Sequence, residues 1–255
     1  MSEPLDLLQA RFPGRPAFDT AISRALLTRV ASGERRESLR LYVPDDVVAF
    51  SVLDRTRPGF DEAVSAARAE GFEAVLRLAG GRAALFTRQC LAFAWCVPAA
   101  DARKGIAARF EQLAALVRDT FSDLGVDARV GAVPGEYCPG DHSVNARGVK
   151  KLMGVGQRVV KGAAHVGGVI VVGNGAQVGR VLEPVYRAMG VDMDPLAAGA
   201  VSDEVPGLTV EHVADALLAR FAQERSLVPA EVGVALTALA EEFEPEHQLA
   251  GQVRV

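Results

Sequence analysis

The chain has 255 residues, of which 49% are apolar, so it is long enough to bury a sizeable hydrophobic core. Its formal net charge of −4 argues against a nucleic-acid-binding protein, because such domains are usually strongly basic. The polar start does not look like a signal peptide, and no run of about 18 apolar residues predicts a membrane span. From Glu183 onward 13 acidic residues stand against 4 Arg or Lys, which leaves the middle of the chain basic.

A hydrophobic periodicity of about 3.6 residues predicts six separate helices, spread from the N-terminal to the C-terminal part of the chain. The clearest is 101–125, where an unbroken apolar stripe indicates a face that packs on the core. Asp61 and Thr209 are expected to cap the helices that they begin. The predicted helices are 16–33, 61–70, 101–125, 177–189, 209–224 and a C-terminal helix at about 229–243.

Short apolar or alternating runs between these helices predict strands. Strands and helices are interspersed without a βαβ repeat, which favours a mixed α+β fold with a largely antiparallel sheet flanked by helices. The sequence predicts one domain over 1–255 with its core at about 15–225, an irregular connection at 191–208 and a loose tail from Pro245. The predicted strands are 38–43, 47–53, 72–78, 84–86, 90–97, 127–131, 137–138, 142–146, 150–155 and 158–172, the last with a break at Gly162.

The stretch from Glu136 to Val172 carries the main chemical signal. It places Cys138 ahead of a segment, 144–172, that contains no Asp or Glu but five Arg or Lys. Nearby positive charge lowers the pKa of a thiol and increases the thiolate fraction, so the pattern indicates acyl or phosphoryl chemistry. By strand parity Lys151 and Lys150 point to opposite faces, and Lys150 is expected to be solvated.

The other two cysteines lie in an apolar run. Cys90 and Cys96 share the parity of one strand face, so both are expected to be buried or half-buried thiols. An odd number of cysteines without metal-type spacing predicts neither a disulfide framework nor a metal site. The pattern indicates a reducing cytoplasm.

Two adjacent glycines, Gly80 and Gly81, separate two predicted strands. Glycines at such a position either form a tight hairpin or allow the backbone to approach a ligand closely. The sequence alone leaves both alternatives open.

Several segments together resemble the lipoate–protein ligase and octanoyltransferase family. They are the helix 16–33 followed by Leu39-Arg-Leu-Tyr42, the loop Arg77-Leu-Ala-Gly-Gly-Arg-Ala83, the segment Lys151-Leu-Met-Gly-Val-Gly-Gln-Arg158, and the apolar strand 165–172. The resemblance covers roughly residues 15–225. It implies a fold like that of biotin and lipoate ligase catalytic domains.

Within the family the chain is most similar to the amidotransferase branch, which moves octanoyl groups between lipoyl-carrier proteins. That branch has a Cys-Pro-Gly-Asp segment, which matches Cys138-Pro-Gly-Asp141. We also expect the chain to lack the C-terminal accessory domain of many ATP-dependent ligases. It departs from the family at His165-Val166, where many members have a His-Gly pair.

The resemblance implies an acyltransferase that moves an octanoyl or lipoyl group onto a lysine through a thioester on Cys138. It implies that Lys151 stabilises negative charge on the acyl carbonyl oxygen. Asp141 and His142 remain minor candidates for assisting the thiol, and the acyl pocket is expected to be apolar. The residues that the resemblance assigns to substrate binding are Arg77, Gly80, Gly81, Arg82, Gly154, Gln157 and His165, with no metal ligand.

The implied partners are lipoyl-carrier proteins, namely the glycine cleavage H protein and the lipoyl domains of 2-oxoacid dehydrogenases. The transferase needs no cofactor. One alternative is an ATP- and Mg-dependent lipoate–protein ligase, in which Lys151 would bind an acyl-adenylate and Cys138 would be incidental. Another is a non-catalytic acyl- or carrier-binding protein. The sequence does not distinguish octanoyl from lipoyl.

Overall fold

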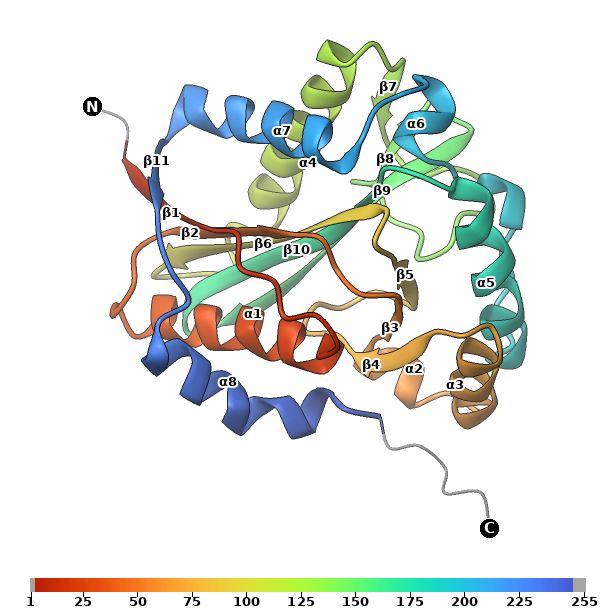
Figure 1. Cartoon of the computed structure of the whole chain (residues 1–255), viewed down its shortest axis with the longest axis horizontal. Helices are drawn as coiled ribbons and strands as arrows, with labels where there is room; N and C mark the ends of the chain where they lie inside the picture. The colour runs from red at the N-terminus through yellow and green to blue at the C-terminus, as the bar shows by residue number, and fades with distance from the viewer. Residues whose placement is uncertain (1–2, 250–255) are drawn as a thin grey trace.

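A computed structural model describes residues 3–249 of the chain. Figure 1 shows a long twisted sheet that crosses the molecule, with helices on both of its faces and a small second sheet beside it. The central strands β6 (Cys90–Ala99) and β10 (Gly162–Val171) are almost entirely buried. They read as continuous apolar runs because helices cover both faces of the sheet.

The large sheet has eight strands, of which three neighbours at one end are parallel and the rest antiparallel. The predicted mixed, largely antiparallel sheet is therefore confirmed. The strand order is β11 (Ser226–Pro229), β1 (Pro4–Leu8), β2 (Ser38–Tyr42), β6, β10, β9 (Lys150–Val160), β8 (Val144–Ala146) and β7 (Ala128–Val130).

The small sheet has three strands, with β3 (Val47–Phe50) between β4 (Glu73–Leu76) and β5 (Ala84–Phe86). Helices α3 (Phe60–Ala69) and α5 (Gly175–Ala188) pack together against it and share one apolar core with it. The connection from β4 to β5 of the small sheet lies against β9 of the large sheet, where the Gly80 N–H donates to the Gln157 carbonyl. This connection includes the Gly80-Gly81 loop.

Two helix pairs cover the large sheet. Figure 1 shows α4 (Ile106–Asp123) with α7 (Val210–Glu224) on one face and α1 (Pro16–Ala31) with α8 (Val234–His247) on the other. Short helices α2 (Val52–Arg55) and α6 (Val201–Glu204) and the 3-10 turn η1 (Pro195–Ala197) lie in connections. Within residues 3–249, no helix is both long and apolar enough to cross a membrane.

Several boundaries differ from the sequence-based predictions. The strand from Val47 ends at Phe50, because the Ser51 hydroxyl accepts a hydrogen bond from the Asp54 N–H and begins α2. Gly59, not Asp61, precedes α3, whereas Thr209 caps α7 as predicted. Strands β1 and β11 were not predicted, because each is short and pairs with a segment far away in the chain.

The predicted break between Val155 and Arg158 is wrong. Strand β9 runs without interruption to Val160, and the chain turns at Gly162, whose φ is +92°. The predicted strand at 137–138 is a loop. The tail from Pro245 is helical as far as His247, and its residues 250–255 lie outside the described part of the chain.

Candidate active site

Cys138 lies in the loop between β7 and β8, and its backbone is held in an unusual conformation. Its φ is +44°, a left-handed value that few non-glycine residues adopt and that costs free energy. The backbone N–H donates to the hydroxyl oxygen of Tyr186 at 2.8 Å, and that hydroxyl donates to the carbonyl of Ala83 at 2.7 Å. Burial raises the pKa of Tyr186, which keeps this hydroxyl protonated. Tyr186 therefore ties the cysteine loop to the start of β5.

The thiol of Cys138 is surrounded by donors and positive charge. Its Sγ accepts the N–H of Arg82 at 3.1 Å and lies 3.5 Å from Nη2 of Arg77. Burial alone would raise the pKa of the Cys138 thiol, but the charges of Arg77 and Lys151 and the Arg82 N–H outweigh burial and lower it. The thiolate fraction of Cys138 is therefore larger than that of an ordinary cysteine, which would suit a nucleophile.

The other two cysteines have the opposite environment, as the sequence predicted. Both are buried. Burial raises the pKa of the Cys90 thiol to about 11, and it raises the pKa of Cys96 as well. Of the three thiols, Cys138 alone has a lowered pKa.

Lys151 is buried directly beneath the cysteine loop, with a relative exposure of 1%. Its ammonium donates to Glu136 Oε1 at 3.1 Å, to the carbonyl of Tyr137 at 3.0 Å and to the carbonyl of Cys138 at 2.7 Å. These three bonds use all three ammonium hydrogens. A role for Lys151 on the acyl carbonyl oxygen would require one of these bonds to be exchanged.

The adjacent Lys150 points the other way, as parity predicted. Its amine donates to the carbonyl of Leu196 on the opposite face of β9. Of the two lysines, Lys151 contacts the cysteine loop and Lys150 does not.

Glu136 is a component of the site that the sequence analysis did not identify. Its carboxylate is buried, at 3% exposure. Besides Lys151 it accepts the N–H groups of Val133 at 2.9 Å and Gly140 at 3.1 Å and the hydroxyl of Ser143 at 2.7 Å. One acid thus closes the loop on both sides of Cys138. The available signal was its position two residues before the candidate cysteine.

The two glycines of the 80–81 loop have different roles. Gly81 has φ +101°, and a Cβ at this position would lie 2.4 Å from Arg77 Nη2 and 2.8 Å from Cys138 Sγ. A Cβ at Gly80 would meet nothing within 4 Å. The Gly80 carbonyl accepts from Arg77 Nη2 at 2.5 Å, which holds the guanidinium beside the thiol.

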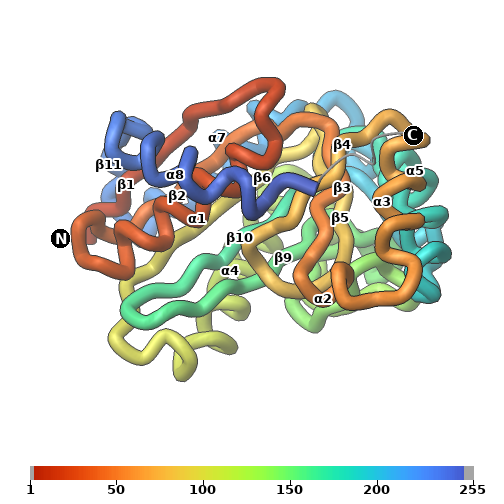
Figure 2. Tube along the Cα trace, turned by 90° about the horizontal axis from the view of Figure 1, so that it is seen from below, coloured from red at the N-terminus to blue at the C-terminus, as the bar shows by residue number. Residues whose placement is uncertain are grey.

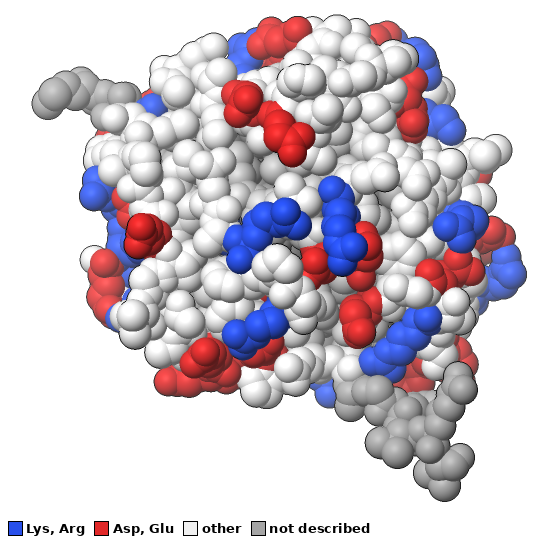
Figure 3. All heavy atoms as spheres, in the orientation of Figure 1, with Lys and Arg blue, Asp and Glu red and all other residues white. Residues whose placement is uncertain are grey.

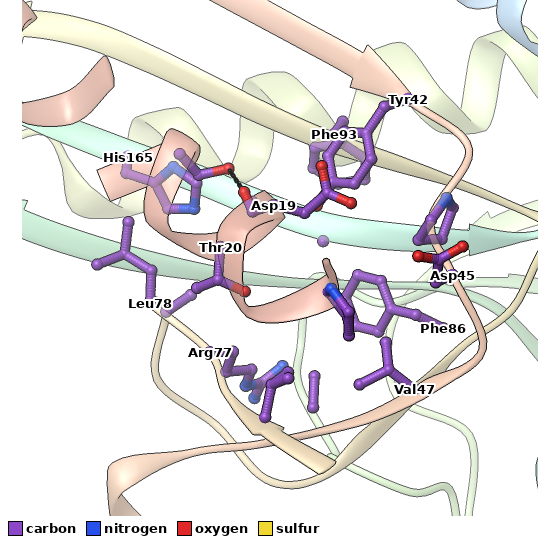
Figure 4. Close-up of a pocket in the computed structure, with 18 residues that line it drawn as sticks. Asp19, Thr20, Tyr42, Asp45, Val47, Arg77, Leu78, Phe86, Phe93 and His165 are labelled. Atoms are coloured by element: carbon purple, nitrogen blue, oxygen red, sulfur yellow. Dashed lines mark hydrogen bonds between the residues drawn. The ribbon is translucent and has the colours of Figure 1, made fainter. Parts of the chain in front are cut away.

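A pocket opens next to Arg77, between α1, β10 and the small sheet. Figure 4 shows Val47, Leu78, Phe86 and Phe93 around it, with Arg77 at one side. The wall formed by α1 and the residues after β2 is polar, so the pocket is apolar over only part of its lining. The polar lining residues are Asp19, Thr20, Ser23, Tyr42, Asp45, Arg77 and His165.

His165 lines this pocket from β10, as expected. Burial lowers the pKa of His165 to about 4, so the ring is neutral at pH 7. Its Nδ1 lies 3.8 Å from Cys96 Sγ, and a Cβ on Gly167 would lie 2.2 Å from its Nε2. The glycine therefore leaves room for the ring.

The remaining candidate residues lie around the site rather than on the thiol. The Gln157 side chain is directed to α4, where it accepts from Arg109 Nε at 3.0 Å and donates to the Ile106 carbonyl at 2.8 Å. A Cβ on Gly154 would lie 3.2 Å from Lys151 Cε, so this glycine makes room for the lysine. The side chain of Arg82 faces Asp54 at 3.6 Å, and only its backbone N–H bonds the thiol.

Within the described part of the chain, neither His142 nor Asp141 forms a hydrogen bond with the Cys138 thiol. The His142 ring stacks on Phe110, with the ring centroids 5.0 Å apart, and Asp141 is exposed. No group of three or more His, Cys, Asp or Glu in the described residues is arranged to hold a metal ion.

Residues 15–222 match the model of the lipoyl protein ligase A/B catalytic domain. The chain belongs to this family. An octanoyl-GcvH:protein N-octanoyltransferase of Geobacillus kaustophilus is 32% identical over 155 residues, which are 59% of this chain and 54% of that protein. A lipoyl-GcvH:protein N-lipoyltransferase of Listeria monocytogenes is 26% identical over 204 residues, which are 74% of this chain and 72% of that protein.

The chain spans only about half of the length of several curated relatives. For three octanoyl-GcvH:protein N-octanoyltransferases, including the Geobacillus protein, the matched shares of their length are 54%, 47% and 60%. Solved structures show the same fold. A lipoate-protein ligase A bound with ATP superposes with a TM-score of 0.74 at 20% identity, over 96% of this chain and 95% of that one. A bipartite lipoate protein ligase from Thermoplasma acidophilum gives 0.72 at 20% identity, over 96% and 93%. The predicted biotin/lipoate ligase-like fold is confirmed.

Proposed function

We propose that this protein moves an octanoyl or lipoyl group onto a lysine of a lipoyl-carrier protein through a thioester on Cys138, without ATP or another cofactor. The observation that carries this proposal is the Cys138 thiol, held between Arg77 Nη2 and the Arg82 N–H with its pKa lowered. The names of the relatives, which act on GcvH, support a glycine cleavage H protein or a lipoyl domain as the partner. The three free cysteines support a reducing cytoplasm as the compartment.

In the first half-reaction the Cys138 thiolate attacks the carbonyl carbon of the acyl group on the donor. The C–S bond forms, the bond from the carbonyl carbon to the donor lysine nitrogen breaks, and the leaving amine takes up a proton. In the second half-reaction the neutral amine of the acceptor lysine attacks the thioester, gives up a proton and releases the thiolate. The full cycle therefore neither consumes nor produces protons.

Residues around Cys138 support a reaction through its sulfur. Arg77 and the Arg82 N–H stabilise the thiolate both as nucleophile and as leaving group. Lys151 and Glu136 hold the loop that presents it. The apolar side of the pocket can bury the acyl chain, and each buried methylene contributes about 0.8 kcal/mol.

The Lys151 contacts fit a thioester route in which this lysine holds the cysteine loop and keeps all three partners. All three ammonium hydrogens are directed to the cysteine loop. An adenylate phosphate would have to displace one of these partners.

The test is intact-mass spectrometry of the purified protein mixed with an octanoylated H protein in the absence of ATP. We expect an adduct with the mass of one octanoyl group. The adduct should be absent in Cys138→Ser and present in Cys90→Ala, because the Cys90 thiol is buried and its pKa is raised. Turnover that occurs only with ATP and free octanoic or lipoic acid would refute the proposal and support the ligase alternative. Carrier binding without turnover under either condition would support a binding protein.

A further inference from the structure

A groove is lined by four arginines from four different parts of the fold. Figure 2 shows the backbone of the elements that carry them, including α1, α2 and β9, from below. The arginines are Arg24 of α1, Arg55 of α2, Arg77 just after β4 and Arg158 of β9. We call it the arginine groove. Glu246 of α8 is the one acid among its lining residues within the described part of the chain.

The positive charge of this groove is only partly neutralised within residues 3–249. Four arginines and one glutamate give a formal charge of +3, in a chain whose net charge is −4. Glu246 pairs with Arg24 at 2.8 Å, whereas Arg55 and Arg158 are exposed and have no ion pair within residues 3–249. On the face shown in Figure 3, by contrast, acidic and basic side chains are interspersed. The groove is therefore a local basic feature of the surface.

The groove adjoins the nucleophile. Arg77 and Leu78 line both the groove and the pocket, and Arg77 Nη2 is 3.5 Å from Cys138 Sγ. A partner in the groove therefore contacts the residue that contacts the thiol.

Exposed apolar side chains lie beside these arginines. On α2, Val52 is 63% exposed and Leu53 is 54% exposed. The neighbouring Asp54 faces the guanidinium of Arg82, whose N–H bonds the thiol. An apolar patch with a charged rim is the ordinary composition of a protein docking surface.

Two buried nitrogen atoms of groove residues also lack hydrogen-bond partners within residues 3–249. They are Nε of Arg77 and Nε2 of His247, whose other ring nitrogen lies 2.7 Å from the Leu76 carbonyl. A carbonyl oxygen can only accept, so Nδ1 carries the proton in that bond. Unpaired buried polar atoms are costly and mark a place where a partner can supply a hydrogen bond after a small rearrangement.

We propose that the arginine groove docks an acidic segment of the protein that carries the acyl-lysine. This inference rests on the proposed function. Donor and acceptor carriers must both bring a lysine to the same sulfur, so they use the same groove and compete for it. Attraction between an acidic carrier face and the groove accelerates encounter and weakens with added salt.

The test reverses the two unpaired arginines in the variant Arg55→Glu/Arg158→Glu. The charge-matched control is Arg129→Glu/Arg147→Glu, two exposed arginines that do not line the groove and lie on and beside the short strands β7 and β8 at one edge of the large sheet. Each protein is tested in a Cys138→Ser background for its Kd toward an octanoylated H protein at low and at high salt. The same variants with Cys138 intact are tested for acylation by a small octanoyl thioester, with no carrier present.

We expect the groove variant to bind the carrier at least tenfold more weakly at low salt and to lose most of the salt dependence of binding. Its acylation by the small thioester should stay within about twofold, a difference well below 1.4 kcal/mol. The control should change neither quantity. Unchanged carrier binding in the groove variant, or equal weakening in the control, would refute the docking proposal. Failure of the unmodified protein to be acylated by any donor would instead refute the proposed function, and the Kd values would still test the groove.

Discussion

The ammonium of Lys151 lies 2.7 Å from the carbonyl oxygen of Cys138, so Cys138 is held through its own backbone. The same ammonium pairs with the buried Glu136. Cys138 in turn has the strained φ of +44°, which persists only where surrounding contacts impose it. Lys151 is thus a positioning residue for the loop as well as one of the charges that lower the pKa of the thiol.

The first prediction compares the two adjacent lysines. Lys151→Met leaves the Glu136 carboxylate buried without its cation, and breaking a buried pair typically costs about 3–5 kcal/mol. It also removes a positive charge that lowers the pKa of Cys138, so the pH at which half of the thiol is reactive should rise. Urea unfolding and the pH dependence of Cys138 alkylation measure the two effects.

Lys150→Met is the matched control, because this amine bonds only the Leu196 carbonyl on the opposite face. Its free energy of unfolding should change by less than about 0.5 kcal/mol, with no change in alkylation. If Lys151→Met is too unstable to study, Glu136→Gln/Lys151→Met should recover part of the loss, since no unpaired charge stays buried. Equal effects of the two single lysine variants would contradict this account.

The second prediction concerns the two arginines at the thiol. In the unmodified protein the positive charge of Arg77 lowers the pKa of Cys138, so alkylation should reach half of its maximum rate at a lower pH than that of an ordinary thiol. Arg77→Met removes the strongest of the lowering charges, and the inflection should move to higher pH. Arg82→Met should leave it in place, because Arg82 bonds the sulfur through its backbone N–H. A shift in Arg82→Met as large as in Arg77→Met would show that this assignment is wrong.

The third prediction separates the paired glycines. Gly81→Ala forces a left-handed φ on an alanine and drives its Cβ to within 2.4 Å of Arg77 Nη2 and 2.8 Å of Cys138 Sγ. We expect a loss of about 1–3 kcal/mol in stability and a slower alkylation of Cys138. Gly80→Ala should be tolerated, because its Cβ would meet open space. Comparable losses in the two variants would indicate that the loop is constrained in some other way.

The sequence predicted the parts of the site that depend on local pattern. Strand parity placed Lys151 and not Lys150 beneath Cys138, and the basic segment without acids predicted a thiol with a lowered pKa. The resemblance put Arg77 at the mouth of a pocket and His165 in its lining, and both residues do line the pocket, whereas their binding of substrate stays a prediction. Each of these statements needs only neighbours in the chain or a known motif.

The rest depends on contacts that no local pattern encodes. Tyr186 reaches Cys138 across 48 positions, and Glu136 acts through groups that are brought together only by the folded loop. The predicted break in β9 was wrong because Gly156 does not form a turn but allows the Gly80 backbone to pack closely against the strand. A Cβ on Gly156 would lie 2.9 Å from the Gly80 carbonyl, whereas Gly162 makes the turn.

The last prediction compares two buried tyrosines at the cysteine loop. Tyr186→Phe orphans the N–H of Cys138 and the carbonyl of Ala83, and each buried orphan costs about 1–3 kcal/mol. The loop should then lose its strained conformation, so urea unfolding should show lower stability and acyl transfer should slow together with it. Tyr137→Phe removes a hydroxyl that is buried without a partner in the described structure and keeps the ring beside Lys151. That variant should be neutral or slightly more stable and should transfer at the normal rate, because nothing in the loop depends on its oxygen. A destabilised Tyr137→Phe with a normal Tyr186→Phe would reverse the assignment of the two hydroxyls.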